Sequence, residues 1–209
     1  VLLLSIRKEH YKYAYKLIRI WCFGMFYGMG FRYELKKLTD KKIDKNTQYV
    51  FISNHTSIMD VMLPCILMPN HPLCYVGKKE LVKIPIFGTI YKRICVMVDR
   101  SSAKSRADVY RRCAERMEEG QSIVIFPEGS RTYDGKMIRF KKGAYQMALD
   151  QHLPIIPITL NGPFDVLPIG SLNVHRHRME MVIHPAVSTE NIDTSHKGMQ
   201  AFADQTQEI

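Results

Sequence analysis

Short apolar runs rich in valine and isoleucine alternate along this chain with longer segments of helical periodicity. The runs have the length of buried strands and lie at residues 49–53, 73–77, 95–98, 122–126, 154–160 and 179–183. Helices are expected at residues 57–68, 102–119, 143–151 and 197–207. Strands that are separated by helices usually pair in the parallel direction. The sequence therefore predicts an α/β fold, with a largely parallel, buried central sheet flanked by helices.

Residues 1–35 differ from the rest, because aromatic side chains crowd together there with basic residues between them. The longest uncharged run, Ile20 to Phe31, has twelve residues, whereas a helix that crosses a bilayer needs about 20. Aromatic rings beside cations suit the headgroup boundary, and four cations are expected to meet anionic lipid there: Lys8, Lys12, Lys16 and Arg19. We predict a membrane-associating helical segment at residues 1–35, lying in the interface, and an α/β domain at residues 36–209. A helix that only packs on the domain is the alternative.

The composition narrows the partners and the compartment. A formal net charge of +10 favours an anionic partner, which is nucleic acid, a phospholipid surface or a phosphorylated substrate. An excess of basic residues that only keeps the protein soluble is the alternative. Five cysteines without a CxxC pair predict free thiols in the core of a protein from a reducing compartment. The short apolar start, which Arg7 and Lys8 follow at once, is not expected to be a signal peptide.

A histidine lies in the turn between the first predicted strand and helix. In the segment Asn54-His55-Thr56-Ser57-Ile58-Met59-Asp60, the imidazole of His55 can reach solvent or substrate. Asp60 lies in the first helical turn, and a fold-back would bring its carboxylate to one ring nitrogen of His55. Such a pair is typical of a general base that activates a hydroxyl. A helix-capping Asp60 beside a surface histidine is the alternative.

A second polar segment follows the strand predicted at residues 122–126. It reads Phe126-Pro127-Glu128-Gly129-Ser130-Arg131-Thr132. Gly129 allows close approach of the backbone to a ligand, and the guanidinium of Arg131 suits phosphate. Glu128 could accept a hydrogen bond from a substrate hydroxyl or hold Arg131 in place. A polar loop with a local Glu–Arg pair is the alternative.

Together the two segments resemble the HxxxxD and FPEGxR motifs of the glycerolipid acyltransferases, which include the lysophosphatidic acid and glycerol-3-phosphate acyltransferases. Two further stretches resemble that family's other motifs, in the same order. One runs from residues 77–81 through 84–88 to Asp99-Arg100, and the other is Pro154-Ile155-Ile156-Pro157-Ile158. The resemblance covers about residues 48–162, and the order of four motifs is more specific than any one of them.

The resemblance implies roles for particular residues. His55 would be the general base and Asp60 its orienting partner, while Lys78 and Arg100 would bind phosphate. The acceptor would be bound or ordered by a third group: Glu128, Gly129, Ser130 and Arg131. Donors for the oxyanion formed during acyl transfer are expected from the backbone around Gly129.

The reaction implied is transfer of a fatty acyl chain from acyl-CoA or acyl carrier protein to the free hydroxyl of lysophosphatidic acid, giving phosphatidic acid. Glycerol-3-phosphate or another lysolipid is the alternative acceptor. No cofactor and no metal ion are expected, since the eight histidines show no ligand spacing such as HExxH. The expected partners are the lysophospholipid, the acyl thioester and a membrane phospholipid surface, and the expected location is the cytoplasmic face of a membrane.

Two other classes of protein, a hydrolase and a binding module without catalysis, are alternatives to an acyltransferase. A thioesterase or lipid hydrolase with a nucleophilic serine would normally carry a GxSxG elbow, and Gly129-Ser130 lacks the second glycine. A binding module without catalysis fits the basic charge loosely. The aromatic residues lie mostly before residue 35, however, and no nucleic-acid-binding fold is recognised, so nucleic acid is not an expected partner.

Overall fold

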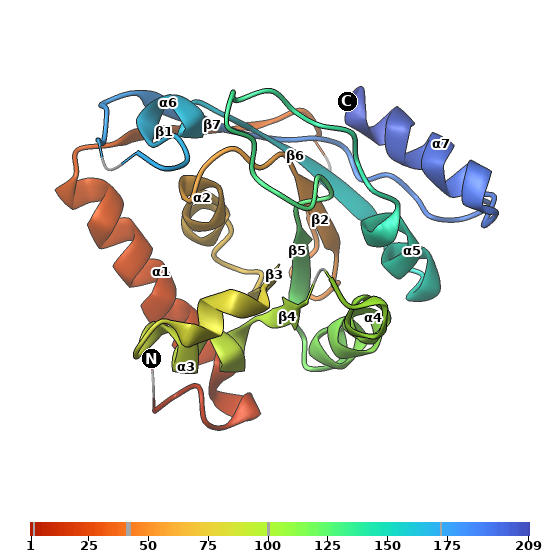
Figure 1. Cartoon of the computed structure of the whole chain (residues 1–209), viewed down its shortest axis with the longest axis horizontal. Coiled ribbons are helices and arrows are strands. Elements are labelled where there is room, and N and C mark those ends of the chain that lie inside the picture. The colour runs from red at the N-terminus through yellow and green to blue at the C-terminus, as the bar shows by residue number, and fades with distance from the viewer. Residues whose placement is uncertain (2, 41–42, 100, 172) are drawn as a thin grey trace.

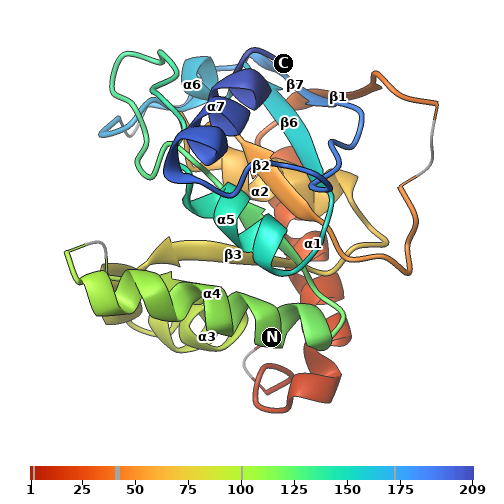
Figure 2. The same cartoon turned by 90° about the vertical axis from the view of Figure 1, so that its right-hand side faces the viewer.

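The computed structural model describes residues 1, 3–40, 43–99, 101–171 and 173–209. Within these ranges one twisted sheet lies between two layers of helices (Figure 1), and the turned view in Figure 2 shows the same layers from the side. The strands are β1 (Arg32–Lys37), β2 (Val50–Ser53), β3 (Leu73–Lys78), β4 (Val96–Val98), β5 (Ser122–Ile125), β6 (Ile155–Asn161) and β7 (Arg178–Ile183). The α-helices are α1 (Tyr11–Gly28), α2 (Met59–Leu67), α3 (Phe87–Ile94), α4 (Ala103–Glu118), α5 (Gly143–Asp150), α6 (Pro163–Val166) and α7 (His196–Gln207), and the 3-10 helices are η1 (Lys8–His10) and η2 (Lys79–Lys83).

The strands form one sheet in the order β1-β7-β6-β2-β5-β3-β4. Neighbouring strands are parallel except β6 and β7, which are antiparallel. This confirms the predicted α/β fold with a largely parallel central sheet. Each strand and helix expected from the sequence is present, and its ends differ by no more than a few residues from those expected.

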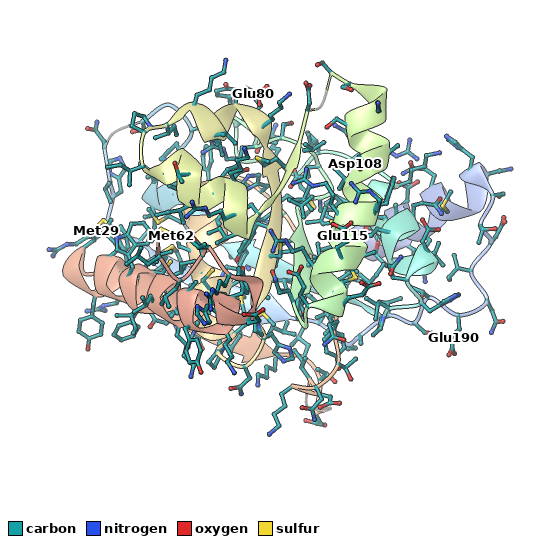
Figure 3. All side chains as sticks on the ribbon, turned by 90° about the horizontal axis from the view of Figure 1, so that it is seen from below. Met29, Met62, Glu80, Asp108, Glu115 and Glu190 are labelled. Atoms are coloured by element: carbon teal, nitrogen blue, oxygen red, sulfur yellow. The ribbon has the colours of Figure 1, made fainter. Side chains whose placement is uncertain are left out.

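Strand β2 shows why the apolar runs form the centre of the molecule. All four of its side chains are buried. Val50 and Ile52 pack with α4, α5 and α7 on one face of the sheet, whereas Phe51 packs with α1, α2 and α3 on the other. Figure 3, seen from below, separates the two layers: Met29 marks the end of α1 on one side, and Asp108 and Glu115 mark α4 on the other. Burial on both faces explains continuous apolar runs in place of alternation.

Strand β1 was not expected from the sequence. Its segment, RYELKK, mixes charged and apolar residues, because β1 lies at the edge of the sheet and is only partly buried. It pairs in parallel with β7, from Arg32 opposite Arg178 to Lys37 opposite Ile183. The boundary that we placed between residues 35 and 36 falls inside β1, so the N-terminal segment continues directly into the sheet. Helices α3 and α6 were also missed, and α6 has only four residues.

Helix α1 packs against α2 through one face, on which Tyr11, Ala14, Tyr15, Cys22 and Phe26 are buried. The guanidinium of Arg19 donates to the carbonyl oxygens of Cys65 and Ile66, at 2.8 and 3.0 Å, and so caps the C-terminal end of α2. The expectation that Arg19 meets lipid headgroups is therefore wrong, because its donors are used inside the fold. None of the described helices has the length and apolar character needed to cross a bilayer.

The cysteines behave as the sequence predicted. All five are free thiols with buried side chains, contributed by helices and strands on both faces of the sheet. They pack as small apolar groups in the two halves of the core.

Candidate active site

The segments singled out in the sequence converge at one edge of the sheet. Strands β2, β5, β3 and β4 are consecutive parallel neighbours, so their carboxyl ends lie side by side. His55 follows β2, Lys78 ends β3 and Glu128 lies in the loop after β5. Open parallel sheets bind their ligands outside the carboxyl ends of the strands. This edge is the candidate active site.

His55 and Asp60 form the contact that the sequence predicted. Nδ1 of His55 lies 3.0 Å from Oδ2 of Asp60. The same carboxylate oxygen accepts hydrogen bonds from the main-chain N–H groups of Thr56 at 2.6 Å and Ser57 at 2.8 Å. Asp60 is completely buried, whereas the His55 side chain keeps 14% of its surface exposed. An acceptor at Nδ1 favours the tautomer with hydrogen on Nδ1, which leaves Nε2 to accept a proton.

The plane of the imidazole is set by aromatic stacking. The ring of Phe126 lies against that of His55, with centroids 3.9 Å apart and an angle of 16° between the planes. Tyr75 stacks in turn on Phe126, at 6.4 Å and 20°, and its hydroxyl donates to the carbonyl of Val61 in α2. The first residue of the second motif thus orients the histidine of the first motif. The sequence did not predict this contact.

Glu128 joins the two motifs, but not as we expected. It is completely buried; its Oε1 accepts a hydrogen bond from the main-chain N–H of His55 at 2.7 Å and its Oε2 accepts from that of Ile138 at 3.0 Å. Burial raises the pKa of Glu128, the two main-chain hydrogen bonds oppose this, and the charge of Asp60 adds to the increase. Glu128 therefore holds the His55 turn in place through the main chain and does not hold Arg131. A contact between Glu128 and the acceptor stays a prediction.

Two further side chains brace the same turn. The Asn54 side chain donates to the carbonyl of Leu160 at 2.9 Å and accepts from the N–H of the same residue at 2.8 Å, which ties the turn to β6. Ser57 donates to the carbonyl of Leu167 at 2.7 Å, beside the end of α6. Helix α2 begins only at Met59, so Ser57 lies before the helix, in the turn. We call Asn54, His55, Asp60 and Glu128 the buried half of the site.

The remaining groups form an exposed rim, which consists of Lys78, Ser130, Arg131 and Lys141. Gly129 has a φ of +76°, and a Cβ placed there would lie 2.7 Å from Nζ of Lys141. Only glycine lets this ammonium group lie over the loop. Lys141 was not expected from the sequence, although the pair Lys141-Lys142 directly before a predicted helix is a visible signal. The N–H of Gly129 donates to the carbonyl of Phe126 and is not free to bind an oxyanion. Oxyanion donors elsewhere in the backbone around Gly129 stay a prediction.

Arg100, the second expected phosphate ligand, lies outside the described residues. Its neighbour Asp99 pairs with Lys79 at 3.8 Å, directly after Lys78. Within the described ranges, no three His, Cys, Asp or Glu side chains gather in a way that could hold a metal ion.

The chain is similar in sequence to a family of known proteins. The family model described as Acyltransferase matches residues 35–161. The 1-acyl-sn-glycerol-3-phosphate acyltransferase BAT2 of Brassica napus, a chloroplastic protein, is 31% identical over 150 residues, which are 71% of this chain and 43% of the relative. The 1-acyl-sn-glycerol-3-phosphate acyltransferase of Helicobacter pylori is 30% identical over 138 residues, covering 64% and 57%. The match thus spans less than half the length of the plant protein.

A solved structure has the same fold. The crystal structure of the 1-acyl-sn-glycerophosphate (LPA) acyltransferase PlsC from Thermotoga maritima matches with a TM-score of 0.76 and 22% identity. The match covers 97% of this chain and 82% of that one, so the whole α/β arrangement described above, with α1 and β1, is shared.

Proposed function

The chain belongs to the Acyltransferase family, and on that premise we propose that it moves a fatty acyl group from an acyl thioester to the free hydroxyl of lysophosphatidic acid, giving phosphatidic acid. The observation that carries the proposal is the contact between His55 and Asp60, held against the second motif by Glu128. Relatives with 1-acyl-sn-glycerol-3-phosphate acyltransferase in their names support the choice of acceptor.

The geometry supports the following steps. Nε2 of His55 takes the proton of the acceptor hydroxyl, and the oxygen attacks the carbonyl carbon of the thioester. Asp60 stabilises the imidazolium that forms. The tetrahedral intermediate then expels the thiolate, which receives the proton from His55. One ester bond forms, one thioester bond breaks, and the free thiol leaves.

The exposed rim supplies positive charge for the acceptor's phosphate. Lys78 and Arg131 are the cations expected from the sequence, and Lys141 adds a third over Gly129. Arg100 stays a proposed phosphate ligand on the strength of the resemblance alone. Ser130 is exposed next to Arg131, and in the proposal its hydroxyl helps to order the acceptor.

Apolar side chains near the dyad suit an acyl chain. Ile58 follows the His55 turn and is exposed, as are Met137 and Ile138, next to the main-chain contact with Glu128. The acyl donor in the proposal is acyl-CoA or acyl carrier protein, and the reaction uses no cofactor or metal ion.

The acceptor's acyl chain places the reaction at a membrane. Extraction of a lysolipid from a bilayer costs about 0.8 kcal/mol for each methylene group, and docking at the surface avoids that cost. Helix α1 carries exposed aromatic and aliphatic side chains along the side that does not pack on α2, including Trp21 and Tyr27. The proposal therefore places the enzyme on the cytoplasmic face of a membrane, with α1 lying in the interface.

The experiment is a thiol-release assay with purified protein, an acyl thioester and lysophosphatidic acid. Release that depends on the acceptor, with phosphatidic acid formed in equal amount, is the expected result. Thiol release without acceptor would identify a thioesterase, and no release with any lysolipid would identify a binding protein. Glycerol-3-phosphate in a parallel reaction tests the alternative acceptor.

A further inference from the structure

Exposed apolar side chains gather at two places in the helical layer that contains α1. The first is α1 itself. The second is the segment through η2 and the start of α3, where four large apolar side chains are exposed: Leu81, Ile84, Ile86 and Phe87. We call residues 81–87 the apolar tip. Nothing in the proposed chemistry uses these side chains, so their exposure calls for a partner.

The backbone of the apolar tip holds Ile86 outward. Ile86 has φ 63° and ψ −57°, and the N–H of Phe87 donates to the carbonyl of Pro85 at 2.6 Å. These values define the rare, strained form of the γ-turn, at a β-branched residue that seldom adopts positive φ. The side chain that the turn presents is 76% exposed. Strain that displays an apolar side chain to solvent, instead of burying it, points to a binding role.

The apolar tip is fixed to the body of the protein. The N–H of Gly88 donates to the carbonyl of Ile84 at 2.7 Å, and a Cβ at Gly88 would lie 1.9 Å from the carbonyl oxygen of Val82. Phe87 stacks on Tyr91, which is buried in the core, with ring centroids 5.5 Å apart. The tip is therefore a rigid projection, whose position the core determines.

Positive charge surrounds the apolar tip. Four exposed lysines lie within or beside it: Lys78, Lys79, Lys83 and Lys92. The acidic residues of the same stretch are Glu80 and Asp99, and Asp99 pairs with Lys79. An apolar tip with exposed lysines in and beside it matches an anionic lipid surface, which offers acyl chains below a layer of negative headgroups.

The position of the apolar tip agrees with that partner. Tyr91 of α3 and Tyr11 of α1 belong to the same hydrophobic cluster, on the same face of the sheet. Seen from below in Figure 3, η2, where Glu80 is labelled, and α1, where Met29 is labelled, lie on the same side of the molecule, away from α4. Both apolar surfaces thus belong to one helical layer.

We propose that the apolar tip inserts into an anionic phospholipid bilayer as a second contact beside α1. The inference rests on the proposed function only for its choice of a membrane as the working surface. Contacts through both α1 and the apolar tip would fix the orientation of the protein on the membrane, whereas contact through α1 alone would leave the protein free to roll about the helix axis. Because Lys78 lies directly before η2, this orientation brings the exposed rim to the level of the headgroups.

The chain's single tryptophan provides the test. Trp21 lies on the exposed face of α1, so its fluorescence reports contact of α1 with lipid. A tip reporter is made by combining Trp21→Phe with Ile86→Trp. The matched control reporter combines Trp21→Phe with Leu38→Trp, since Leu38 is exposed beyond β1, at the opposite edge of the sheet from β4. Each protein is mixed with phosphatidylcholine–phosphatidylglycerol vesicles whose acyl chains are brominated near the headgroup.

We expect bromine to quench the tip reporter about as strongly as it quenches Trp21 in the parent protein, with little quenching of the control reporter. Quenching of the tip reporter no stronger than that of the control reporter would overturn the proposal. An emission of the tip reporter that changes with acyl-CoA in the absence of vesicles would also overturn it, in favour of a substrate contact. If Ile86→Trp does not fold, Ile84→Trp carries the reporter at a residue with ordinary φ.

A binding measurement supplements the fluorescence. Ile86→Asn should weaken co-sedimentation with the same vesicles by roughly tenfold, the loss expected from removing one inserted aliphatic side chain, whereas Leu38→Asn should not change it. Equal binding of the two variants would contradict the proposal. Neither measurement depends on acyl transfer, so failure of the tip and failure of the proposed reaction are distinguishable.

Discussion

The buried half of the site and its exposed rim differ in how their side chains are held. Asp60 and Glu128 have no exposed surface. Main-chain N–H groups and the His55 ring hold Oδ2 of Asp60, and main-chain N–H groups hold both carboxylate oxygens of Glu128. Arg131 and Lys141 lie in water on a loop. Charges in water interact weakly, whereas buried hydrogen bonds fix geometry. The buried half should therefore control the rate of the chemical step, and the rim should control affinity for the acceptor.

The largest effect is expected for His55→Ala. Removal of the base should lower kcat by about 10³–10⁴-fold, within the upper part of the range for general acid–base catalysis. The Michaelis constant for lysophosphatidic acid should change little. Thiol release by the folded variant measures this, with the circular dichroism spectrum as the control for folding. More than a few per cent of residual activity would remove His55 from its role as base.

Asp60→Asn should have the next largest effect. The amide oxygen can still accept from Thr56 and Ser57, so the turn survives while the charge that stabilises the imidazolium is lost. We expect kcat to fall by about 10²–10³-fold. Steady-state kinetics at saturating acceptor give the value. Activity equal to that of the parent protein would reduce Asp60 to a structural residue of the turn.

Glu128→Gln tests whether Glu128 controls the rate of the chemical step, as expected of the buried half, by holding the main chain at His55. The amide group can accept only one of the two main-chain hydrogen bonds and would face the other N–H with its own donors. We expect kcat to fall by roughly 10²-fold through misplacement of His55, and the free energy of unfolding to fall by about 1–3 kcal/mol. A change in the Michaelis constant alone would place Glu128 with the rim.

The difference in stability between the parent protein and this variant should also depend on pH. Because burial raises the pKa of Glu128, the folded protein holds that proton more tightly than the unfolded chain. The contribution of Glu128 to stability is then full below the unfolded pKa, about 4.3, and is lost as pH rises through the higher folded pKa. Urea unfolding should show the gap between parent and Glu128→Gln narrowing over that range. A gap that widens with pH would contradict the shift.

The smallest effects are expected at the rim. Arg131→Ala and Lys141→Ala should each raise the Michaelis constant for lysophosphatidic acid by up to about fivefold, as exposed charges contribute up to about 1 kcal/mol. The value of kcat should stay within twofold or so. Added salt should reduce both effects. Lys197→Ala, which removes an exposed lysine of α7, is the control. A large fall in kcat for Lys141→Ala would move that residue into the buried half.

The same contrast explains what the sequence could predict. The strands and the contact of His55 with Asp60 follow from local patterns, because continuous apolar runs form buried strands and a turn brings residues five apart together. The role of Glu128 could not be read in this way, since its partners, His55 and Ile138, depend on how β2 and β5 lie side by side.

Strand β1 and Arg19 illustrate a second limit. The mixed sequence of β1 forms a strand because β7 offers a free edge, and Arg19 turns inward because α2 ends nearby with open carbonyl groups. Both outcomes arise from tertiary neighbours that override local preference. The sequence suggested that Arg19 binds lipid, because a sequence shows the charge of a side chain but not its neighbours in the fold.

The pairing of β1 with β7 also sets an order of events during synthesis of the protein. Arg32 pairs with Arg178, so β1 leaves the ribosome long before the strand that completes it. Pairing of β1 with β7 closes a long loop of chain, and the entropy that this costs is offset only by the contacts that β7 makes. The edge of the sheet can therefore be completed only late in synthesis, after strands β2 to β6 have left the ribosome.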